Sequence, residues 1–463
     1  MKKYCYVMCL AVATAVMLSL TACSRDNKNP EIEEPEIPEI PEPEIVKCTD
    51  CGSFWRYDFT YGTLDTDGKT PITLSAAIFM TPDVHEKNIN AKGCGLMNHY
   101  TFTSNGQRPT NVSSGFTLEG ILTNSNYIMI ESDGFGFGVD SLGNQKYLQG
   151  RSTARVNIDA FIAGRNLIKE EGYEFGDVIL NLGYSQGGHS GMWVNRLLAE
   201  GYRIDELPGI DYCIIGGGPY DIYSHYRYLL SEKSMQYPVV LPLIVSGMAD
   251  AGGEKVKYED ILNADLVQYM SELLDSKQHD VDYINDFMFE RYGTGDGGSL
   301  LIENIVQPAF FDEESEPMKE IVRNLKENSL VYDSWLPTRT DRIMFIHSKE
   351  DEVVPFLNQE SMTSFLQKNG YTAFEIDDAS DANHATTGIY YVMKTAIMLS
   401  SYVPEGKSMK SSKAPAESTF DIYGEDGGLV LGNVTLLDAY RMLPDGVYVI
   451  NGKKSVKKSI FEL

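Results

Sequence analysis

Short apolar runs alternate with helical stretches over most of the chain, and this alternation restricts the fold more than any other feature. The apolar runs cover residues 95–98, 127–130, 177–182, 212–215, 343–346 and 373–376. The helical stretches cover residues 115–122, 152–169, 187–200 and 386–400. Such alternation is typical of βαβ units, which build a parallel sheet covered by helices on both faces. The sequence therefore predicts an α/β fold with a mostly parallel sheet.

Three regions depart from this alternation. Residues 57–61 and 72–79 are strand-like and flank the turn sequence Asp-Thr-Asp-Gly, which predicts an N-terminal antiparallel hairpin. Residues 216–340 hold few strand-like runs and many aromatic and methionine side chains. We expect a helical cap there, with some of these side chains lining an apolar pocket. Residues 403–463 are expected to form a linker and a short β-like tail, which leaves residues 48–402 as the main domain.

The first 47 residues have the composition of a targeting segment followed by a tether. Lys2 and Lys3 precede an apolar run, and Leu-Thr-Ala-Cys at residues 20–23 resembles a bacterial lipobox, whose cysteine is acylated. This resemblance implies a signal peptide over residues 1–22 and lipid attachment at Cys23; a plain signal peptide with an incidental cysteine is the alternative. Residues 23–47 are rich in proline and glutamate, which predicts an extended tether.

A lipid-anchored protein of this kind is expected in the bacterial cell envelope, at the periplasmic or the surface face of the outer membrane. The membrane would then be a partner through the N-terminal anchor alone. The net charge of −27 disfavours nucleic acid as a second partner. The last part of the tail, residues 443–454, resembles the C-terminal β-tails of secreted proteins of Bacteroidetes. The oligomeric state is left open.

Four cysteines follow Cys23. Cys48 and Cys51 have the spacing of a redox motif without its usual strand and helix context, and we expect a local disulfide or two free thiols. Cys94 and Cys213 lie in strand-like runs and are expected to be small buried apolar side chains.

The sequence Gly-Tyr-Ser-Gln-Gly at residues 183–187 separates a strand-like run from a helical stretch. A serine on such a turn is exposed at a helix N-terminus, where the dipole and the free N–H of Gln186 favour negative charge. Gly183 and Gly187 let strand and helix approach closely, because they carry no Cβ. We therefore predict Ser185 to be a nucleophile.

An acid and a histidine follow in the order that this turn requires. Asp351 comes after the apolar run at residues 343–346, and His384 comes after the last strand-like run. In this order the acid orients the imidazole, and the imidazole takes the proton of the serine. Glu350 is the alternative acid. We expect His99, His189 and His347 to have supporting roles rather than to transfer protons.

These motifs together resemble the α/β-hydrolase superfamily and, within it, secretory lipase-like and related esterase families. Residues 183–188 match the family's nucleophile turn, and residues 347–355 match its His-Gly-x-x-Asp-x-x-Val-Pro segment, with Ser348 in place of glycine. The resemblance extends over residues 55–402 and implies an α/β-hydrolase fold. It also implies an oxyanion hole made by the backbone N–H groups of Gln186 and Tyr100. Tyr100 replaces the glycine of a usual His-Gly pair.

The expected activity is that of a serine carboxylic ester hydrolase, esterase-like or lipase-like, that forms an acyl-enzyme on Ser185. No metal and no cofactor are expected, and the substrate is a small or acylated molecule. A serine peptidase of the prolyl-oligopeptidase type uses the same three residues and remains an alternative. A binding module that kept the fold without catalysis is the third possibility.

Overall fold

The computed structural model describes residues 40–141, 143–249, 256–293, 299–379, 381–402 and 418–460. The predicted signal peptide, Cys23 and most of the predicted tether lie outside these residues. The described residues belong to one compact unit that begins at Ile40. None of the helices within the described ranges combines the length and the apolar character needed to cross a bilayer.

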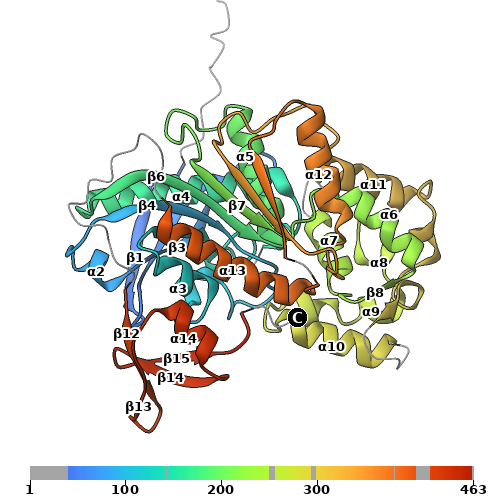
Figure 1. Ribbon diagram of the computed structural model, residues 1–463. Coiled ribbons are helices and arrows are strands. Elements are labelled where there is room, and N and C mark those ends of the chain that lie inside the picture. The colour runs from blue at the N-terminus through green and yellow to red at the C-terminus, as the bar shows by residue number, and fades with distance from the viewer. Residues whose placement is uncertain are drawn as a thin grey trace, which may run out of the picture. The chain divides into compact units, whose positions relative to one another are not determined.

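The centre of this unit is a nine-stranded sheet (Figure 1). In spatial order its strands are β1 (Glu44–Asp50), β2 (Trp55–Leu64), β3 (Pro71–Met80), β5 (Ile128–Ser132), β4 (Ala91–Asn98), β6 (Phe175–Tyr184), β7 (Tyr212–Gly216), β10 (Ile343–His347) and β11 (Phe374–Asp378). The pairs from β1 to β5 are antiparallel, and all pairs from β5 to β11 are parallel. The predicted fold class, an antiparallel start followed by a mostly parallel sheet, is confirmed.

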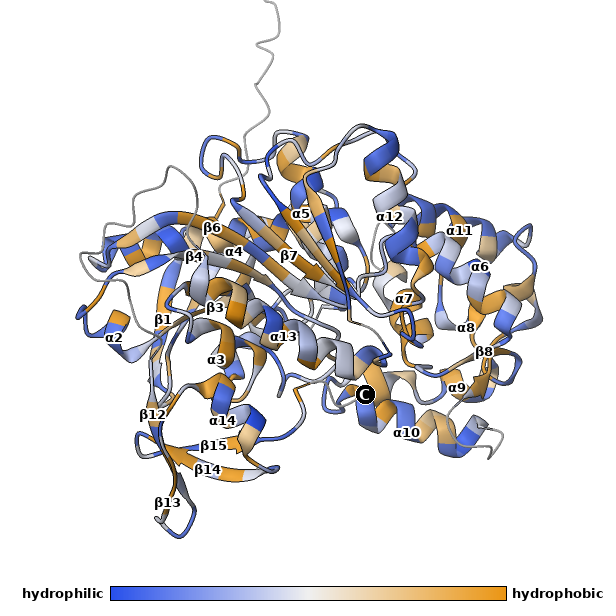
Figure 2. Cartoon of the chain, viewed as in Figure 1, coloured by the Kyte–Doolittle hydropathy of each residue, from blue (hydrophilic) through white to orange (hydrophobic). Residues whose placement is uncertain are grey.

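Helices cover both faces of the sheet because the parallel strands are apolar on both faces (Figure 2). In β10, Ile343 and Phe345 belong to one buried cluster, and Met344 and Ile346 belong to another. The first cluster includes side chains of α4 (Gly150–Glu170), α5 (Gln186–Ala199) and α12 (Leu357–Lys368). The second includes side chains of α3 (Leu118–Thr123) and α13 (His384–Ser401). Cys94 and Cys213 are fully buried, one strand apart from each other across β6, and burial raises the pKa of each thiol to about 12.

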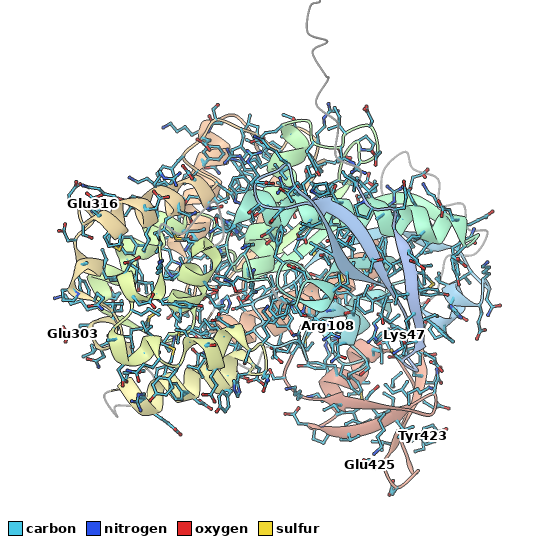
Figure 3. All side chains as sticks on the ribbon, turned by 180° about the vertical axis from the view of Figure 1, so that it is seen from behind. Lys47, Arg108, Glu303, Glu316, Tyr423 and Glu425 are labelled. Atoms are coloured by element: carbon cyan, nitrogen blue, oxygen red, sulfur yellow. The ribbon has the colours of Figure 1, made fainter. Side chains whose placement is uncertain are left out.

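The helical cap lies between β7 and β10 and has an apolar core of its own. It consists of α6 (Ile222–Glu232), α7 (Val240–Ala249), α8 (Tyr258–Ile261), α9 (Ala264–Val267), α10 (Val281–Tyr292), α11 (Glu316–Asn328) and the short strands β8 (Ser234–Met235) and β9 (Leu300–Leu301). Acidic side chains such as Glu303 and Glu316 stand on its outer surface (Figure 3). The remaining short elements are α2 (Pro82–His85), single turns at Pro109–Asn111, Gly138–Asp140, Ile302–Asn304 and Pro308–Phe311, and a π-helical turn at Ser271–Asp275.

The C-terminal part forms a second sheet, ordered β13 (Leu429–Val434), β12 (Phe420–Gly424), β14 (Gly446–Ile450) and β15 (Lys453–Lys457), with α14 (Leu436–Met442) beside it. All of its pairs are antiparallel. Its apolar side chains belong to the same buried cluster as those of α3 and α13. The Asn451 side chain donates to the carbonyl of Gly52 over 2.9 Å. The tail is therefore packed against the main domain.

The start of the domain differs in detail from the sequence prediction. The tether was predicted to reach residue 47, but Glu44 already begins β1, which pairs with β2. Ile45 packs against the first of the two buried clusters, and this contact stabilises the acidic segment as a strand. Cys48 is exposed in β1 and Cys51 is buried after it, and both are free thiols, which is one of the two predicted outcomes.

Candidate active site

Ser185 lies on a tight turn between β6 and α5. Its backbone has φ 57° and ψ −121°, a conformation that costs free energy and is held by its surroundings. The Ser185 N–H donates to the carbonyl of Gly216 on β7 over 2.9 Å. A Cβ on Gly187 would lie 2.1 Å from the carbonyl oxygen of Asn98, and one on Gly183 would lie 2.2 Å from that of Gly187. The two glycines are thus required by close backbone contacts, as the sequence predicted.

His384 bridges Ser185 and Asp351. Its Nε2 lies 2.9 Å from the Ser185 hydroxyl, and its Nδ1 lies 2.7 Å from Oδ2 of Asp351. His384 is the first residue of α13 and is buried. Since Nδ1 faces a carboxylate, it carries the proton, and Nε2 is left as an acceptor for the serine hydroxyl. The structure thus brings together the three residues that the sequence order predicted.

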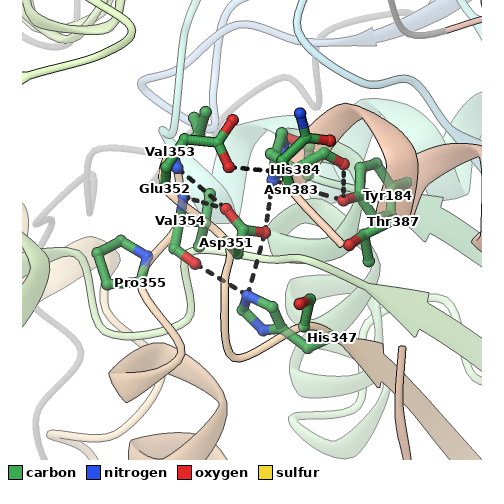
Figure 4. Close-up of polar contacts among 12 residues, drawn as sticks. Tyr184, His347, Asp351, Glu352, Val353, Val354, Pro355, Asn383, His384 and Thr387 are labelled. Atoms are coloured by element: carbon green, nitrogen blue, oxygen red, sulfur yellow. Dashed lines mark hydrogen bonds and ion pairs between the residues drawn. The ribbon is translucent and has the colours of Figure 1, made fainter. Parts of the chain in front are cut away.

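Asp351 is held on the loop after β10 by a set of donors (Figure 4). Its Oδ1 accepts from the N–H groups of Val353, at 3.0 Å, and Val354, at 2.7 Å. His347 Nε2 lies 3.3 Å from Oδ2 and 2.9 Å from the carbonyl oxygen of Val354. Burial alone would raise the pKa of Asp351, but the charge of His384 and the hydrogen bonds from His347 and His384 hold it well below its usual range. The carboxylate is ionised at neutral pH.

Two further contacts position His384. The carboxylate of Glu352 accepts from the His384 backbone N–H over 2.9 Å, and the hydroxyl of Tyr184 donates to the His384 carbonyl over 2.6 Å (Figure 4). The sequence motifs did not predict that Glu352 or Tyr184 would contact His384. Glu350, the alternative acid, is exposed, and the carboxylate that contacts the imidazole is that of Asp351.

The predicted oxyanion donors lie on two neighbouring segments. Gln186 is the first residue of α5, where backbone N–H groups have no helical partner. Tyr100 is on the loop after β4, and the close contact of Gly187 with Asn98 brings this loop against the nucleophile turn. Thr101 lines the same cavity as Ser185, whereas Tyr100 and Gln186 line a second cavity. The assignment of the second donor to Tyr100 stays a prediction.

An apolar cavity opens beside Ser185 and is walled largely by the cap. The cap side chains that line it are mainly aliphatic and aromatic, and include Ile222, Tyr226, Leu229, Met235, Leu241 and Val245. His225 also lines it, and burial lowers the pKa of this histidine to about 4. The cavity is therefore uncharged at neutral pH and suits an apolar ligand group placed next to Ser185.

His189 is buried one turn into α5, beside Trp193 and the carbonyl of Asn328, to which its Nε2 approaches within 2.8 Å. It thus packs in the interior, as expected. Within the described residues, one group of three side chains has the proximity of metal ligands, namely His99, Glu119 and Glu131. None of these three belongs to the contacts around Ser185.

No protein-family model matches this sequence, and no curated protein sequence matches it. Solved structures do match. The rice cell wall degrading esterase LipA from Xanthomonas oryzae gives a TM-score of 0.63 at 17% identity, over 79% of this chain and 98% of that one. A candidate hydrolase from Legionella pneumophila gives 0.64 at 18% identity, over 78% and 97%. Candida antarctica lipase A in its closed state gives 0.56 at 15% identity, over 78% and 82%. This chain therefore has the α/β-hydrolase fold, in the form that these esterase and lipase structures share.

Proposed function

We propose that this protein is a serine carboxylic ester hydrolase that works through an acyl-enzyme on Ser185. The observation that carries the proposal is the continuous contact from the Ser185 hydroxyl to His384 Nε2, at 2.9 Å, and from His384 Nδ1 to Asp351, at 2.7 Å. A serine hydroxyl is a weak nucleophile until an adjacent base takes its proton. This arrangement supplies the base and orients it.

The reaction would proceed in two halves. His384 takes the proton as the Ser185 oxygen attacks the ester carbonyl, and the Gln186 N–H with a second donor near Tyr100 stabilises the oxyanion. The imidazolium, stabilised by Asp351, then gives its proton to the departing alcohol. In the second half, water attacks the acyl carbonyl while His384 takes one of its protons. His384 then gives that proton to the Ser185 oxygen as its bond to the acyl group breaks, which releases a carboxylic acid and restores the serine hydroxyl.

The apolar cavity supports an acyl chain as the recognised part of the substrate. Its walls offer aliphatic and aromatic side chains next to Ser185, and transfer of each CH₂ from water into such a site contributes about 0.8 kcal/mol. Two of the structural neighbours are an esterase and a lipase. An ester with a medium or long acyl chain is therefore the proposed substrate class.

We also propose that the protein acts in the bacterial cell envelope. Acylation of Cys23 would attach the protein to the outer membrane of a bacterial envelope, and the acidic tether would keep the domain clear of the lipid surface. Radioactive palmitate incorporation into the wild type, and its absence in Cys23→Ala, would test the anchor. Palmitate in the Cys23→Ala protein would refute it.

A fluorophosphonate probe tests the nucleophile directly. We expect it to label the wild type and not Ser185→Ala, with Ser190→Ala as the control, because Ser190 lies on the same helix and donates to a helix carbonyl. Folded wild type that stays unlabelled would remove the hydrolase proposal. A panel of p-nitrophenyl esters of rising chain length, run beside aminoacyl p-nitroanilides, separates esterase from peptidase. Faster cleavage of the anilides would favour the peptidase.

Filling the cavity tests the acyl pocket. Leu241→Trp should lower kcat/KM for long-chain esters by at least about tenfold, while acetyl esters lose much less, because only the long chain needs the cavity. Tyr283→Trp, at an exposed position of α10, is the matched control in the cap. An equal loss for acetyl and long-chain esters would mean that the chain binds elsewhere.

A further inference from the structure

A second cluster of ionisable side chains is buried behind the loop that follows β4. His99 comes from that loop, Glu119 from α3 and Glu131 from β5, and one ligand atom of each lies within 4.8 Å of the other two. Glu119 and Glu131 are each 1% exposed. The three residues are distant in sequence and come from three elements, so the fold itself assembles the cluster.

The polar atoms of this cluster lack the partners that burial demands. Both carboxylate oxygens of Glu131, and Nε2 of His99, have no hydrogen-bond partner. Asp133, two residues after Glu131, shows the contrast, because it accepts from Ser75 at 2.5 Å and from the side chain and backbone of Thr110 at 2.7 and 2.9 Å. A buried carboxylate without partners is strongly unfavourable. A bound ligand could supply the interactions that the carboxylate oxygens of Glu131 lack.

The hydrogen bond made by Nδ1 of His99 determines which ligand Nε2 of the same ring can bind. His99 Nδ1 donates to the carbonyl of Tyr100 over 2.8 Å, so the neutral ring presents a lone pair at Nε2. The Nε2 atom lies 3.8 Å from Oε1 of Glu119. Among the residues that the structure describes, no lysine or arginine forms an ion pair with Glu119 or Glu131. One lone pair and two carboxyl groups converge, and a divalent cation would balance the charge of −2 that the cluster would carry with both carboxyl groups ionised.

We propose that His99, Glu119 and Glu131 bind a divalent transition-metal ion, with Zn²⁺ the first to test. One imidazole and two carboxylates form a set of three that suits such an ion better than Ca²⁺ or Mg²⁺, which prefer oxygen ligands alone. Two ligands at about 2.1 Å from a tetrahedral ion lie about 3.4 Å apart, so the 3.8 Å between His99 and Glu119 requires only a small closure. A water molecule would complete the coordination.

The ion would stabilise the loop after β4, which lies beside Ser185. The ring of His99 packs against that of Tyr100 with centroids 4.3 Å apart, and Tyr100 is followed by Thr101, which lines the cavity at Ser185. The hydrogen bond that His99 Nδ1 donates to the Tyr100 carbonyl is of the kind that usually orients a metal-bound imidazole. Metal binding at this site does not depend on the proposed hydrolase activity. Its ligands are separate from Ser185, Asp351 and His384.

Metal content and thermal stability test the proposal on the complete mature protein. After removal of metal with EDTA and dialysis, we expect the wild type to bind about one equivalent of Zn²⁺ by elemental analysis, with a rise in Tm. Glu131→Gln and Glu119→Gln should each bind Zn²⁺ at least about tenfold more weakly and lose the Zn²⁺-dependent rise. Glu303→Gln, on the exposed surface of the cap, is the control and should keep both.

A proton shared within the cluster is the competing explanation, and the same variants separate it from a metal. Glutamine has the shape of a protonated glutamate. If the cluster holds only a proton, Glu131→Gln would be as stable as the wild type or more stable, and Zn²⁺ would change the Tm of neither protein. That result would overturn the proposal. Equal Zn²⁺ binding by the wild type and both glutamine variants would also overturn it, because the ion would then lie elsewhere. If Glu131→Gln fails to fold, Glu119→Gln provides the same comparison.

Discussion

The hydroxyl of Tyr184 donates a hydrogen bond of 2.6 Å to the backbone carbonyl of His384. This contact joins the residue before Ser185 to the first turn of α13, which carries the imidazole. The Tyr184 side chain and the His384 backbone therefore help to fix the distance between Ser185 and His384, in addition to the hydrogen bond between those two residues.

Tyr184→Phe removes this link without changing the shape of the core. We expect a loss of about 1–3 kcal/mol in unfolding free energy, because a buried carbonyl loses its donor, and a lower kcat. Urea unfolding and initial rates on one p-nitrophenyl ester measure both quantities. An unchanged kcat would mean that Glu352 and the helix alone position His384.

Asp351→Asn should lower kcat by about 10⁴, because an amide in place of the carboxylate favours the wrong tautomer of His384. Glu350→Gln is the matched control, since Glu350 is adjacent and exposed, and it should leave kcat within about twofold. Steady-state kinetics on folded protein measures the difference. The reverse pattern would make Glu350 the acid.

Tyr100→Phe should leave kcat nearly unchanged if the second oxyanion donor is a backbone N–H, because the substitution removes only the side-chain hydroxyl. Gln186→Ala should behave in the same way for the first donor. Rates on an acetyl ester test both variants. A loss of 10² or more in either would indicate that the side chain itself contacts the oxyanion.

Stability should fall at mildly acidic pH because of His189. Burial lowers the pKa of His189 to about 4, below the value of about 6.5 in the unfolded chain. The unfolded chain therefore takes up the proton first, so this contribution is complete above pH 6.5 and is lost as the pH falls toward 4. The expected loss from this group is about 2 kcal/mol between pH 7 and 5.

Urea unfolding of the wild type and His189→Gln at both pH values measures that loss. The variant should be less stable at pH 7 and should lose less stability on going to pH 5. His279→Gln, in the cap, serves as the control and should keep the full wild-type decrease. Equal decreases in wild type and His189→Gln would contradict the assignment.

The C-terminal sheet should be required for the stability of the whole domain. Ile450 is fully buried in the cluster that also contains side chains of α3, so Ile450→Ala should cost about 2–5 kcal/mol. Val430→Ala, on the exposed face of β13, should cost little. A single unfolding transition that moves as a whole is expected in fluorescence and circular dichroism. Two separate transitions would show that the tail unfolds independently.

The parallel sheet could be predicted because strands buried on both faces have to be apolar along their whole length. Residues 343–346 are such a strand, and they face two different cores. The order of Ser185, Asp351 and His384 could likewise be predicted, because one fold places a nucleophile, an acid and a base in that order. In both cases the signal lies in short segments, each of which can be recognised from its own consecutive residues.

Features that depend on contacts between distant segments could not be predicted. Glu352 supports His384 through the backbone N–H, a role that any carboxylate at the right distance could fill, so no motif marks it. His99, Glu119 and Glu131 meet only because β4, α3 and β5 are neighbours in space. The acidic residues of β1 carry the composition of a tether, and only their pairing with β2 shows that they form a strand.

The hydrogen bond between Asn451 and Gly52 spans 399 positions of the chain. A polypeptide emerges from the ribosome N-terminus first, and contacts of such separation are among the last to form. The core around α3 stays incomplete until β14 has been made and has docked, so a nascent chain would expose apolar surface throughout its synthesis. A chain that lacks β14 would keep part of this apolar surface exposed, and we expect it to be cleaved by proteases faster than the full chain.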